Sequence, residues 1–548
     1  MLGYLDDNSK LTDSAQAIFK SHAPQNAIIL AAEFGMRMVP INMITPKALL
    51  EVNGERLIDR LITQLHEVGI TDITVVIGFM KDSFEYLIDD FGVKLVYAAD
   101  YASTNNIHSL VLAADQISNT YIISSDIWCN QNPFSRQELY SWYMVTDIVD
   151  DHSDVRLNRK MELVKIPENS GGNGMIGISY LTGKEAETVK QRILDYAADS
   201  SYDDKFWEEA LYSCDRMLVR AKVVHGADVV EINTYEQLRE LDANSNQLKS
   251  DAIDVIAETF GCETDDIVDI EVLKKGMTNR SFLFRINKGE KAGKYIMRIP
   301  GEGTDQLIDR AAEALVYKTI SGFSLCDDPV YINPQNGYKI TAFLEDVRTC
   351  DSDDVDDLKK CMTLLKKFHH MKLSVPHTFD IFKEIDFYEN LWEGDPSMYE
   401  DYAKTKENVL SLKPFLDGLE KDWCLTHIDA NQDNFLFYKT EEGQGLQLTD
   451  WEYAGMQDPH VDVAMFCIYA MYNKEQIDRL IDIYFDGQCD RITRAKIYAY
   501  IAMCGLLWSN WCEYKRKLGV EFGEYSLSQY QYAKDYYQYT KELMGNDL

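Results

Sequence analysis

The sequence predicts two domains of different fold class: an α/β domain with a mostly parallel sheet and helices on both faces, and then an α+β domain with two lobes. Continuously apolar runs alternate with helical patterns between residues 27 and 125, and such runs are typical of strands buried on both faces in a parallel sheet. Beyond residue 270, strand-like runs come first, and helical patterns dominate from residue 354 onward. A β-rich part followed by an α-rich part favours an α+β domain.

The chain length of 548 residues also requires more than one hydrophobic core, because single cores stop growing at about 250–300 residues. A polar stretch over residues 241–247 is the predicted junction. We therefore expect an N-terminal appendage over residues 1–25, the α/β domain over residues 26–243 and the two-lobed domain over residues 244–548.

The expected elements of the first domain follow from their apolar patterns. Helices place apolar residues three and four positions apart, whereas buried strands are short, unbroken apolar runs. We expect strands over residues 27–32, 72–78, 93–98 and 120–125, with helices over residues 56–68, 84–88 and 107–117.

The second domain is expected to open with antiparallel strands and to contain one hairpin of functional interest. A Gly-containing turn separates two short apolar runs that pair naturally across it. These runs cover residues 435–438 and 446–449, while the earlier strands are expected over residues 271–273, 281–286 and 294–299, and a helix is expected to begin at Arg310.

Composition and charge restrict the classes of function. The net charge of −35 would repel nucleic acids and anionic membranes, so neither is an expected partner. No apolar run is long enough to act as a signal peptide or to span a bilayer. The eleven cysteines include no Cys-x-x-Cys pair, which predicts reduced, mostly buried thiols in a cytoplasmic protein.

A His-x-Asp-x-x-x-x-Asn motif near residue 430 predicts phosphoryl transfer. His427, Asp429 and Asn434 form this motif, and the expected hairpin ends at Asp450. In phosphotransferases of the protein-kinase type, the first Asp accepts the hydroxyl proton, while the Asn and the second Asp hold Mg²⁺ against the phosphates of ATP. The spacing thus predicts Asp429 as the catalytic base and Asn434 and Asp450 as metal ligands, with three unrelated surface acids as the alternative.

The first lobe of this domain carries candidates for phosphate binding. Arg298 lies on an expected strand and Glu313 near the start of an expected helix. An ion pair between them would position a phosphate-binding cation, and a plain surface salt bridge is the alternative. Gly276, Thr278 and Asn279 lie in a turn that could cover the phosphates.

Residues 276–537 resemble the choline kinases, within the wider group of choline/ethanolamine and aminoglycoside phosphotransferases. The resemblance rests on the motif around Asp429, on the Asp-Trp-Glu-Tyr run over residues 450–453, and on a late aromatic helix over residues 506–511. It implies choline as the acceptor, and aromatic faces suit a quaternary ammonium because that group cannot donate a hydrogen bond. The choline-binding residues that it implies are Tyr453, Trp508, Trp511 and Tyr525, with ordinary helix packing as the alternative for the tryptophans.

The loop after the first strand predicts a nucleotide site in the α/β domain. Backbone N–H groups of such a loop bind a triphosphate, and nearby cations neutralise it. A later strand ends at Asp126, where Mg²⁺ would be needed, although a helix cap or turn is the alternative. The expected nucleotide-binding residues are Ala31, Ala32 and Gly35, with Arg37 and Lys47 as catalytic cations.

Residues 27–241 resemble the bacterial CTP:phosphocholine cytidylyltransferases. The resemblance rests on this loop and on the runs over residues 105–110, 206–209 and 230–233. It implies that Glu231 joins the strand-end Asp in holding Mg²⁺. It further implies a phosphocholine site that contains Asn106, Trp207 and Glu208, and a half-buried helix face is the alternative for the last two.

Two positions depart from that family. Glu33 stands where the family has Gly, so its side chain would crowd the turn and bring a carboxylate toward the triphosphate. Asn233 stands where Asp is expected and removes one negative charge from the metal site. Residues 2–21 resemble the tail of a winged-helix domain, a strand-turn-strand followed by a helix, for which the acidity of the chain argues against DNA binding.

Together, these features predict a tandem enzyme that makes CDP-choline with Mg²⁺ as its cofactor. The second domain would transfer the γ-phosphoryl group of ATP to choline, and the first would join phosphocholine to CTP with release of pyrophosphate. One alternative is a sugar nucleotidyltransferase fused to an aminoglycoside-type phosphotransferase. The other is a choline kinase whose first domain only binds nucleotides or acts as a scaffold.

Overall fold

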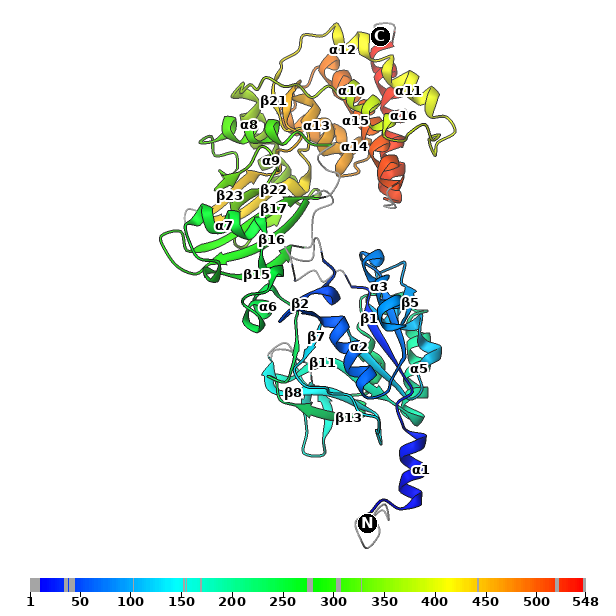
Figure 1. Ribbon diagram of the computed structural model, residues 1–548. Helices are drawn as coiled ribbons and strands as arrows, with labels where there is room; N and C mark the ends of the chain where they lie inside the picture. The colour runs from blue at the N-terminus through cyan, green and yellow to red at the C-terminus, as the bar shows by residue number, and fades with distance from the viewer. Residues whose placement is uncertain are drawn as a thin grey trace. The chain divides into compact units, whose positions relative to one another are not determined.

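The computed structural model describes residues 10–33, 38, 45–101, 103–150, 153, 155–167, 170–273, 279–301, 307–326, 328–440, 443–517 and 522–545. Contacts divide the chain into two compact units, Met1–Val272 with Phe284–Lys291 and Leu273–Leu283 with Ala292–Leu548. Each unit is described by itself (Figure 1). The predicted domain boundary after residue 243 stays a prediction.

A mixed sheet forms the centre of the first unit. Its ten strands in the described residues have the order β5-β4-β1-β6-β11-β8-β13-β10-β9, and β12 pairs with β13. The four strands at one end are parallel and coincide with the four predicted strands, which confirms the parallel part of the prediction. They are β1 (Asn26–Ala31), β4 (Asp72–Ile77), β5 (Lys94–Tyr97) and β6 (Thr120–Ser124).

The rest of this sheet was not predicted and is mostly antiparallel. β11 pairs antiparallel with both β6 and β8, whereas β13 runs parallel to β8. Short connections link β8, β9, β10 and β11, and such connections allow neighbouring strands to run in opposite directions. The strands are β8 (Trp142–Asp150), β9 (Val155–Leu157), β10 (Glu162–Lys165), β11 (Gly172–Leu181), β12 (Tyr212–Ser213) and β13 (Arg216–Val224).

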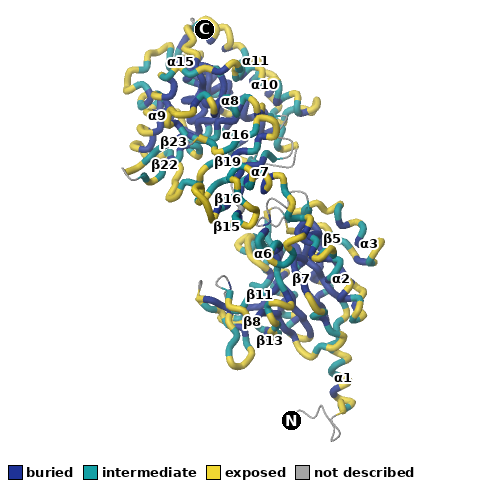
Figure 2. The backbone as a smooth tube through the Cα atoms, turned by 60° about the vertical axis from the view of Figure 1, so that its left-hand side comes forward, coloured by how far each residue is buried: buried dark blue, intermediate teal, exposed yellow. Residues whose placement is uncertain are grey.

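Helices cover both faces of the sheet, as predicted, and bury its central strands (Figure 2). Ala27 and Ile29 of β1 belong to one buried cluster with residues of α2 and α3, whereas Ile28 and Leu30 belong to a second cluster with residues of α4 and α5. Successive side chains of a strand point to opposite faces, so the unbroken apolar run of β1 needs cover on both sides. The helices are α2 (Leu57–Glu67), α3 (Tyr86–Phe91), α4 (Asn106–Val111) and α5 (Gly183–Tyr196).

The remaining elements of the first unit are short. The predicted helix over residues 107–117 is divided into α4 and a separate 3₁₀ turn, η5 (Ala114–Gln116). Two strand pairs lie outside the main sheet, β2 (Glu51–Val52) with β3 (Glu55–Arg56) and β7 (Ile127–Cys129) with β14 (Val229–Glu231). The other elements are α1 (Asp13–Ser21), η3 (Lys47–Leu49), η4 (Lys81–Phe84), η6 (Ser200–Tyr202), η7 (Trp207–Leu211), α6 (Tyr235–Leu241), η8 (Asn246–Leu248), α7 (Asp251–Phe260) and η9 (Thr264–Asp266).

A five-stranded sheet in the order β15-β16-β17-β19-β18 precedes the helical part of the chain. β19 pairs antiparallel with both β17 and β18. The three predicted strands lie within β15, β16 and β17, and the predicted helix begins at Arg310 as α8. The elements are β15 (Ile267–Leu273), β16 (Asn279–Ile286), β17 (Gly293–Pro300), α8 (Arg310–Ile320), β18 (Tyr331–Ile332) and β19 (Lys339–Ala342).

The second unit is mainly helical beyond residue 354, as predicted, and its helices share one large apolar core. The predicted hairpin is also present, since Phe435 pairs with Leu448 and Tyr438 with Gly445. The elements are β20 (Arg348–Thr349), α9 (Val355–His370), α10 (Ile381–Asn390), α11 (Tyr402–Leu410), α12 (Lys413–Asp417), β21 (Cys424–Thr426), η11 (Gln432–Asn434), β22 (Phe435–Thr440), β23 (Gly443–Leu448), β24 (Gly455–Gln457), α13 (His460–Tyr469), α14 (Lys474–Tyr484), α15 (Arg491–Lys517) and α16 (Glu524–Met544).

The state of the cysteines agrees with the predicted free, mostly buried thiols. All eleven cysteines lie in the described residues and are free, and seven of them are buried. Within the described ranges, no helix combines the length and the apolar character that crossing a membrane would require.

The close packing of α15 against α16 depends on Gly505. A Cβ atom at this position would lie 2.7 Å from the backbone oxygen of Gln529 and 2.9 Å from the Cβ atom of Tyr532. Both separations are shorter than real side chains tolerate, so only glycine permits this approach of the two helices.

Gly505→Ala is therefore expected to destabilise the second unit by about 1–3 kcal/mol, because overpacking forces the two helices apart. Thermal unfolding followed by circular dichroism measures the effect. Gly293→Ala is the matched control, since a Cβ atom there meets only the side chain of Tyr295, at 3.6 Å. An unfolding temperature of Gly505→Ala equal to that of the wild type would contradict the packing argument.

Candidate active sites

A buried carboxylate holds the loop that carries Asp429. The backbone N–H groups of His427 and Ile428 donate to Oδ2 and Oδ1 of Asp462 at 3.0 and 2.7 Å. Nε2 of His369 lies 2.9 Å from the same Oδ2 atom. Asp462 is fully buried in α13, where hydrogen bonds to an ionised group are strong. This carboxylate therefore positions the loop, in which Ile428 adopts a positive φ of 72°.

Sequence reasoning did not select Asp462 or His369. The available signal was an aspartate inside the otherwise apolar helix α13. A carboxylate at such a position needs several hydrogen-bond donors, because an unpaired buried charge is costly.

The structure brings Asp429, Asn434 and Asp450 together, as the hairpin predicts. Nδ2 of Asn434 donates to the backbone oxygen and to Oδ2 of Asp429, at 2.8 and 3.1 Å. Burial, together with the neighbouring Asp450 carboxylate, raises the pKa of Asp429 to about 8. Two carboxylates that repel each other, with an amide oxygen beside them, are a donor set that suits Mg²⁺.

Metal binding by these residues stays a prediction. Within the ranges that the structure describes, no group of three or more His, Cys, Asp or Glu side chains is arranged to hold a metal ion. The predicted ligands in the second unit are one carboxylate, Asp450, and one amide, Asn434, which is a weak arrangement for a protein alone and a common one where substrate phosphates complete the shell.

Arg298 of β17 and Glu313 of α8 form the predicted ion pair. Nη1 and Nη2 of Arg298 lie 2.5 and 2.8 Å from Oε1 and Oε2 of Glu313. Both residues are buried, 5% and 1% exposed, so the pair is not a surface salt bridge. Although burial alone opposes ionisation, Lys339, Arg298 and Arg310 hold the pKa of Glu313 at about 2.

Three residues that sequence reasoning did not select complete this charge cluster: Arg310, Lys339 and Glu452. Nη1 of Arg310 lies 3.1 Å from Oε2 of Glu313 and 3.1 Å from Oε2 of Glu452. Asn279, a predicted nucleotide-binding residue, donates to the same Glu452 atom at 2.9 Å. The cluster therefore connects β16, α8 and the Asp-Trp-Glu-Tyr run.

Six aromatic residues form one cluster in the second unit. Trp508 of α15 packs edge-on against Tyr453 and Trp511, with ring centroids 6.0 and 5.5 Å apart. Tyr469 of α13 lies 5.5 Å from Trp508 and 6.0 Å from Tyr525. The structure thus brings the four predicted choline-binding residues together and adds Tyr469 and Phe522, the latter 4.9 Å from Trp511.

This aromatic cluster is tightly packed and lies beside Asp429, the predicted catalytic base. Trp508 and Trp511 are each 4% exposed, and Nε1 of Trp508 donates to the sulfur of Met465 at 3.2 Å. Burial and the nearby Asp429 carboxylate raise the pKa of the Tyr469 and Tyr453 hydroxyls. The choline-binding role of the cluster stays a prediction, while its position beside Asp429 is a finding.

In the first unit, Lys47 contacts one of the residues predicted to hold Mg²⁺. Its Nζ atom contacts Oδ2 of Asp126 and lies 2.7 Å from Oδ1 of Asn233. Burial opposes the charge of Lys47, but Asp126, Glu33 and Glu231 together outweigh it and raise the pKa of the ammonium above its usual value. Lys47 therefore supplies positive charge at the place where the sequence predicts a metal ion.

Asp126 and Glu231 reach this place from paired strands. Ile127, directly after Asp126, pairs with Glu231 in the β7–β14 ladder, and the N–H of Ile232 donates to the backbone oxygen of Asp126 at 2.9 Å. Burial, together with the charge of Asp126, raises the pKa of Glu231 to about 8. Two carboxylates that share a buried site are a donor set that fits a divalent cation.

The predicted nucleotide loop leaves β1 beside these carboxylates. Ala31 ends β1, Ala32 follows it, and both are buried. The N–H of Ser125 donates to the backbone oxygen of Leu30 at 3.1 Å, so the ends of β1 and β6 lie together, where parallel sheets commonly bind ligands. Four predicted residues lie outside the described residues: Gly35 and Arg37 here, and Gly276 and Thr278 in the second domain.

The residues predicted for a phosphocholine site have different surroundings. The Tyr143 hydroxyl donates to Oε1 of Glu208 at 3.0 Å, and burial raises the pKa of Glu208 to about 7. Trp207 is fully buried in the core, and its backbone N–H donates to Oδ1 of Asn106 at 2.7 Å. A half-buried helix face is therefore wrong for Trp207, whose ring is covered on all sides.

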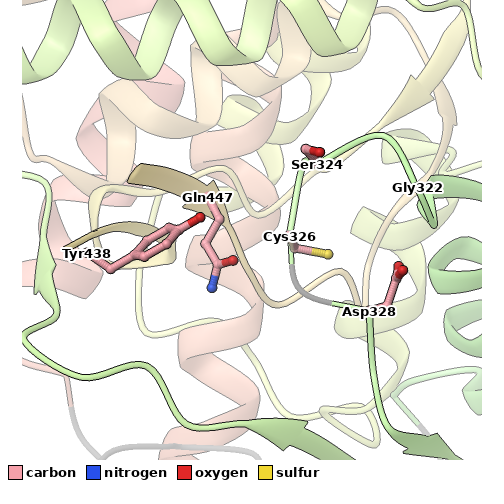
Figure 3. Close-up of a pocket in the computed structure, with 6 residues that line it drawn as sticks. All are labelled: Gly322, Ser324, Cys326, Asp328, Tyr438 and Gln447. Atoms are coloured by element: carbon pink, nitrogen blue, oxygen red, sulfur yellow. The ribbon is translucent and has the colours of Figure 1, made fainter. Parts of the chain in front are cut away.

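The structure also contains a polar cavity of about 240 Å³. Figure 3 shows Tyr438 and Gln447 of the hairpin facing a loop that carries Ser324, Cys326 and Asp328. None of the predicted site residues lines this cavity.

Comparison with known proteins assigns both parts of the chain. The family model of the choline/ethanolamine kinases matches residues 270–485, and that of the MobA-like NTP transferase domain matches residues 27–128. The choline-phosphate cytidylyltransferase of Streptococcus pneumoniae is 31% identical over 221 residues, which are 39% of this chain and 96% of the relative. The chain belongs to the choline-phosphate cytidylyltransferase family. It carries a nucleotidyltransferase domain followed by a choline/ethanolamine kinase domain, as predicted.

Two further similarities concern one domain each. The 2-aminoethylphosphonate cytidylyltransferase of Lancefieldella rimae is 30% identical over 34% of this chain and 78% of the relative. The crystal structure of the choline kinase LicA from Streptococcus pneumoniae is 27% identical and covers 53% of this chain and 100% of that chain, with a TM-score of 0.45.

Glu208→Gln is expected to stabilise the nucleotidyltransferase domain at alkaline pH. Folding raises the pKa of Glu208 from near 4.5 to about 7, so the unfolded chain loses this proton first and stability falls as pH rises between these values. One pKa unit corresponds to about 1.4 kcal/mol, and the glutamine variant should therefore gain roughly 3 kcal/mol at pH 8 and nothing near pH 4.

Thermal unfolding of the full chain between pH 5 and 8 measures this difference. Glu209→Gln is the control, because the Glu209 carboxylate pairs with Lys165 at 3.1 Å and is only partly buried. The same pH dependence in Glu208→Gln and in the wild type would show that Glu208 is not the group that titrates.

Proposed function

We propose that this protein makes CDP-choline in two consecutive steps. The kinase domain phosphorylates choline with ATP, and the nucleotidyltransferase domain transfers CMP from CTP to the phosphocholine. The observation that carries the proposal is the aromatic cluster beside Asp429. Ring faces hold a quaternary ammonium by cation–π attraction, and the hydroxyl end of choline would then reach the base.

In the kinase step, Asp429 orients the choline hydroxyl and accepts its proton as the oxygen attacks the γ-phosphorus of ATP. The raised pKa of Asp429, about 8, suits a base that works near neutral pH. Arg298, fixed by Glu313, adds positive charge near the phosphates. Mg²⁺ held by Asn434 and Asp450 would neutralise charge on the transferred group. Most of the catalysis is positioning and charge neutralisation.

In the cytidylyltransferase step, a phosphate oxygen of phosphocholine attacks the α-phosphorus of CTP and pyrophosphate leaves. Both reactants are anions, so the protein must supply positive charge, and Lys47 is the cation that the described part of the site offers. Mg²⁺ held by Asp126 and Glu231 would supply the rest. The carboxylates of Glu33 and Glu208, which influence each other, suit the cationic end of phosphocholine and oppose the triphosphate.

The substrate of the first domain has a second candidate. Another relative, 30% identical over 193 residues, acts on 2-aminoethylphosphonate, according to its name, and this compound has a primary amine in place of a quaternary ammonium. A buried carboxylate such as Glu208 would accept hydrogen bonds from an amine, whereas a quaternary ammonium offers none. The kinase domain on the same chain favours phosphocholine, because it would produce that substrate.

A coupled assay tests the proposal. The full chain is incubated with choline, ATP, CTP and Mg²⁺, and CDP-choline is followed by mass spectrometry. Ethanolamine and kanamycin replace choline in parallel kinase assays, while phosphoethanolamine and 2-aminoethylphosphonate replace phosphocholine in assays of pyrophosphate release. Absence of choline phosphorylation would refute the kinase assignment. CTP binding without pyrophosphate release would favour a first domain that only binds nucleotides.

Trp508→Ala should raise the KM for choline roughly tenfold, because one aromatic face contributes about 0.5–2 kcal/mol to cation binding. The KM for ATP should change far less, since Trp508 contacts Tyr453, Tyr469 and Trp511 rather than the charge cluster. Steady-state kinetics with each substrate varied separates the two constants. Trp423→Ala, at a ring that is 38% exposed, is the control. Equal increases in both KM values would mean that Trp508 is a core residue only.

A further inference from the structure

Asn233 and Asp126 together hold the side chain of Lys47. Nζ of Lys47 contacts Oδ2 of Asp126 and donates to Oδ1 of Asn233 at 2.7 Å. Lys47 and Asp126 are each only 6% exposed, so this ammonium lies inside the protein and not at its surface. An ammonium has three donors, and these two acceptors leave one of them for another oxygen, such as that of a phosphate.

The backbone on both sides of Asn233 is fixed by hydrogen bonds. The N–H of Ile232 donates to the backbone oxygen of Asp126 at 2.9 Å, which ties the end of β14 to the segment after β6. The N–H groups of Asn233 and Thr234 both donate to Oε1 of Gln237, at 2.7 and 3.0 Å. This glutamine belongs to the capping box of α6, which fixes where the helix begins. The Asn233 side chain therefore extends toward Lys47 from a backbone with little freedom.

The same place contains a carboxylate oxygen without a partner. Oδ1 of Asp126 is buried and accepts no hydrogen bond within the described residues. Since a buried acceptor without a partner is costly, this oxygen suits a bound cation. Glu231 approaches from the paired strand, but across the described ranges no third His, Cys, Asp or Glu side chain completes a metal-binding group. Asn233 stands where the family resemblance predicts the additional carboxylate.

An amide at position 233 accepts the Lys47 proton as a carboxylate would, but it adds no charge. A carboxylate there would bring a second negative charge to an ammonium that is already paired with Asp126. Affinity for a divalent cation rises with the number of charged ligands, whereas negative charge in a site repels a triphosphate. The amide therefore favours the nucleotide and disfavours a cation that arrives without it.

We propose that Asn233 is a positioning residue that holds the Lys47 ammonium for the triphosphate and keeps the affinity of the domain for a free divalent cation low. The cation then enters together with the nucleotide, as is common for Mg²⁺ sites in which substrate phosphates complete a shell of one or two carboxylates. This inference rests on the nucleotide binding that is part of the proposed function. It gives the departure of residue 233 from the family pattern a physical consequence.

Four variants of the full chain test this role. Asn233→Asp keeps the acceptor oxygen and adds a charge, whereas Asn233→Ala removes the acceptor. Asn130→Asp is the matched control, because it makes the same change at an exposed residue that directly follows β7. The oxygen of Asn130 that accepts from Nε1 of Trp128 at 2.8 Å is retained in that variant. Asp450→Asn shows how much of the bound metal belongs to the kinase domain.

Two affinities are measured for each variant. Binding of Mn²⁺ without nucleotide is followed by electron paramagnetic resonance of the free ion, and binding of CTP in the presence of EDTA is followed by isothermal titration calorimetry. Thermal unfolding is recorded for every variant. The kinase domain contributes equally to the wild type and to both Asn233 variants, so differences among them arise in the first domain.

We expect Asn233→Asp to bind free Mn²⁺ at least about tenfold more tightly than the wild type, through the added carboxylate. It should bind metal-free CTP at least about fivefold more weakly, through the added negative charge. Asn233→Ala should also bind CTP about fivefold more weakly, because Lys47 loses one of its two contacts. Asn130→Asp should keep both affinities within about twofold of wild type, since an exposed charge is screened. A merely structural role of Asn233 would not change the two affinities in opposite directions.

Two results would overturn the inference. One is an equal Mn²⁺ affinity in Asn233→Asp and Asn130→Asp, and the other is a wild-type CTP affinity in both Asn233 variants. These measurements need no turnover, so a failure to release pyrophosphate from CTP and phosphocholine would refute the proposed transferase step alone. A wild-type chain that binds no CTP, with or without Mg²⁺, would refute both the proposed transferase step and this inference.

Discussion

The two backbone hydrogen bonds that Asp462 accepts are the interaction on which the kinase site depends. They fix the loop at His427 and Ile428, and the position of Asp429 follows from theirs. The fully buried carboxylate of Asp462 is stabilised in turn by these donors and by His369. Since an unpaired charge in the core is costly, the loop and the helix α13 can only be stable together. Asn434 and the hairpin to Asp450 then build on a loop that is already in place.

The buried carboxylates of the two domains have neighbours of opposite charge. In the kinase domain, Glu313 is surrounded by Arg298, Arg310 and Lys339, and its pKa is about 2. In the nucleotidyltransferase domain, burial and neighbouring acids raise the pKa of Glu208 to about 7 and that of Glu231 to about 8. The first arrangement is complete within the protein. The second has more buried negative charge than Lys47 neutralises, which is the electrostatic condition of a site that receives cations with its substrate.

The sequence alone identified those site residues that a single local element, such as a hairpin, brings together. Asn434 and Asp450 were predicted to meet because a hairpin joins them, and its pairing was confirmed. Arg310 and Asp462 were missed, because Glu452, the second partner of Arg310, and the loop that Asp462 holds lie far away in sequence, and no short motif marks them. For Trp207, the alternative to a phosphocholine-binding role was a half-buried helix face, but the ring is completely buried in the core.

The order of residues alone was sufficient for the two fold classes, the parallel strands of residues 26–124, the kinase motif and the family of each domain, because these depend on local periodicity and on short motifs. It was not sufficient for the antiparallel part of the first sheet, the charge cluster around Glu313 or the contacts of the Tyr469 ring with Trp508 and Tyr525. Those features depend on which distant segments become neighbours when apolar faces are buried. Burial also sets the pKa values on which the proposed chemistry depends, since the cost of a buried charge is decided by its surroundings and not by its position in the chain.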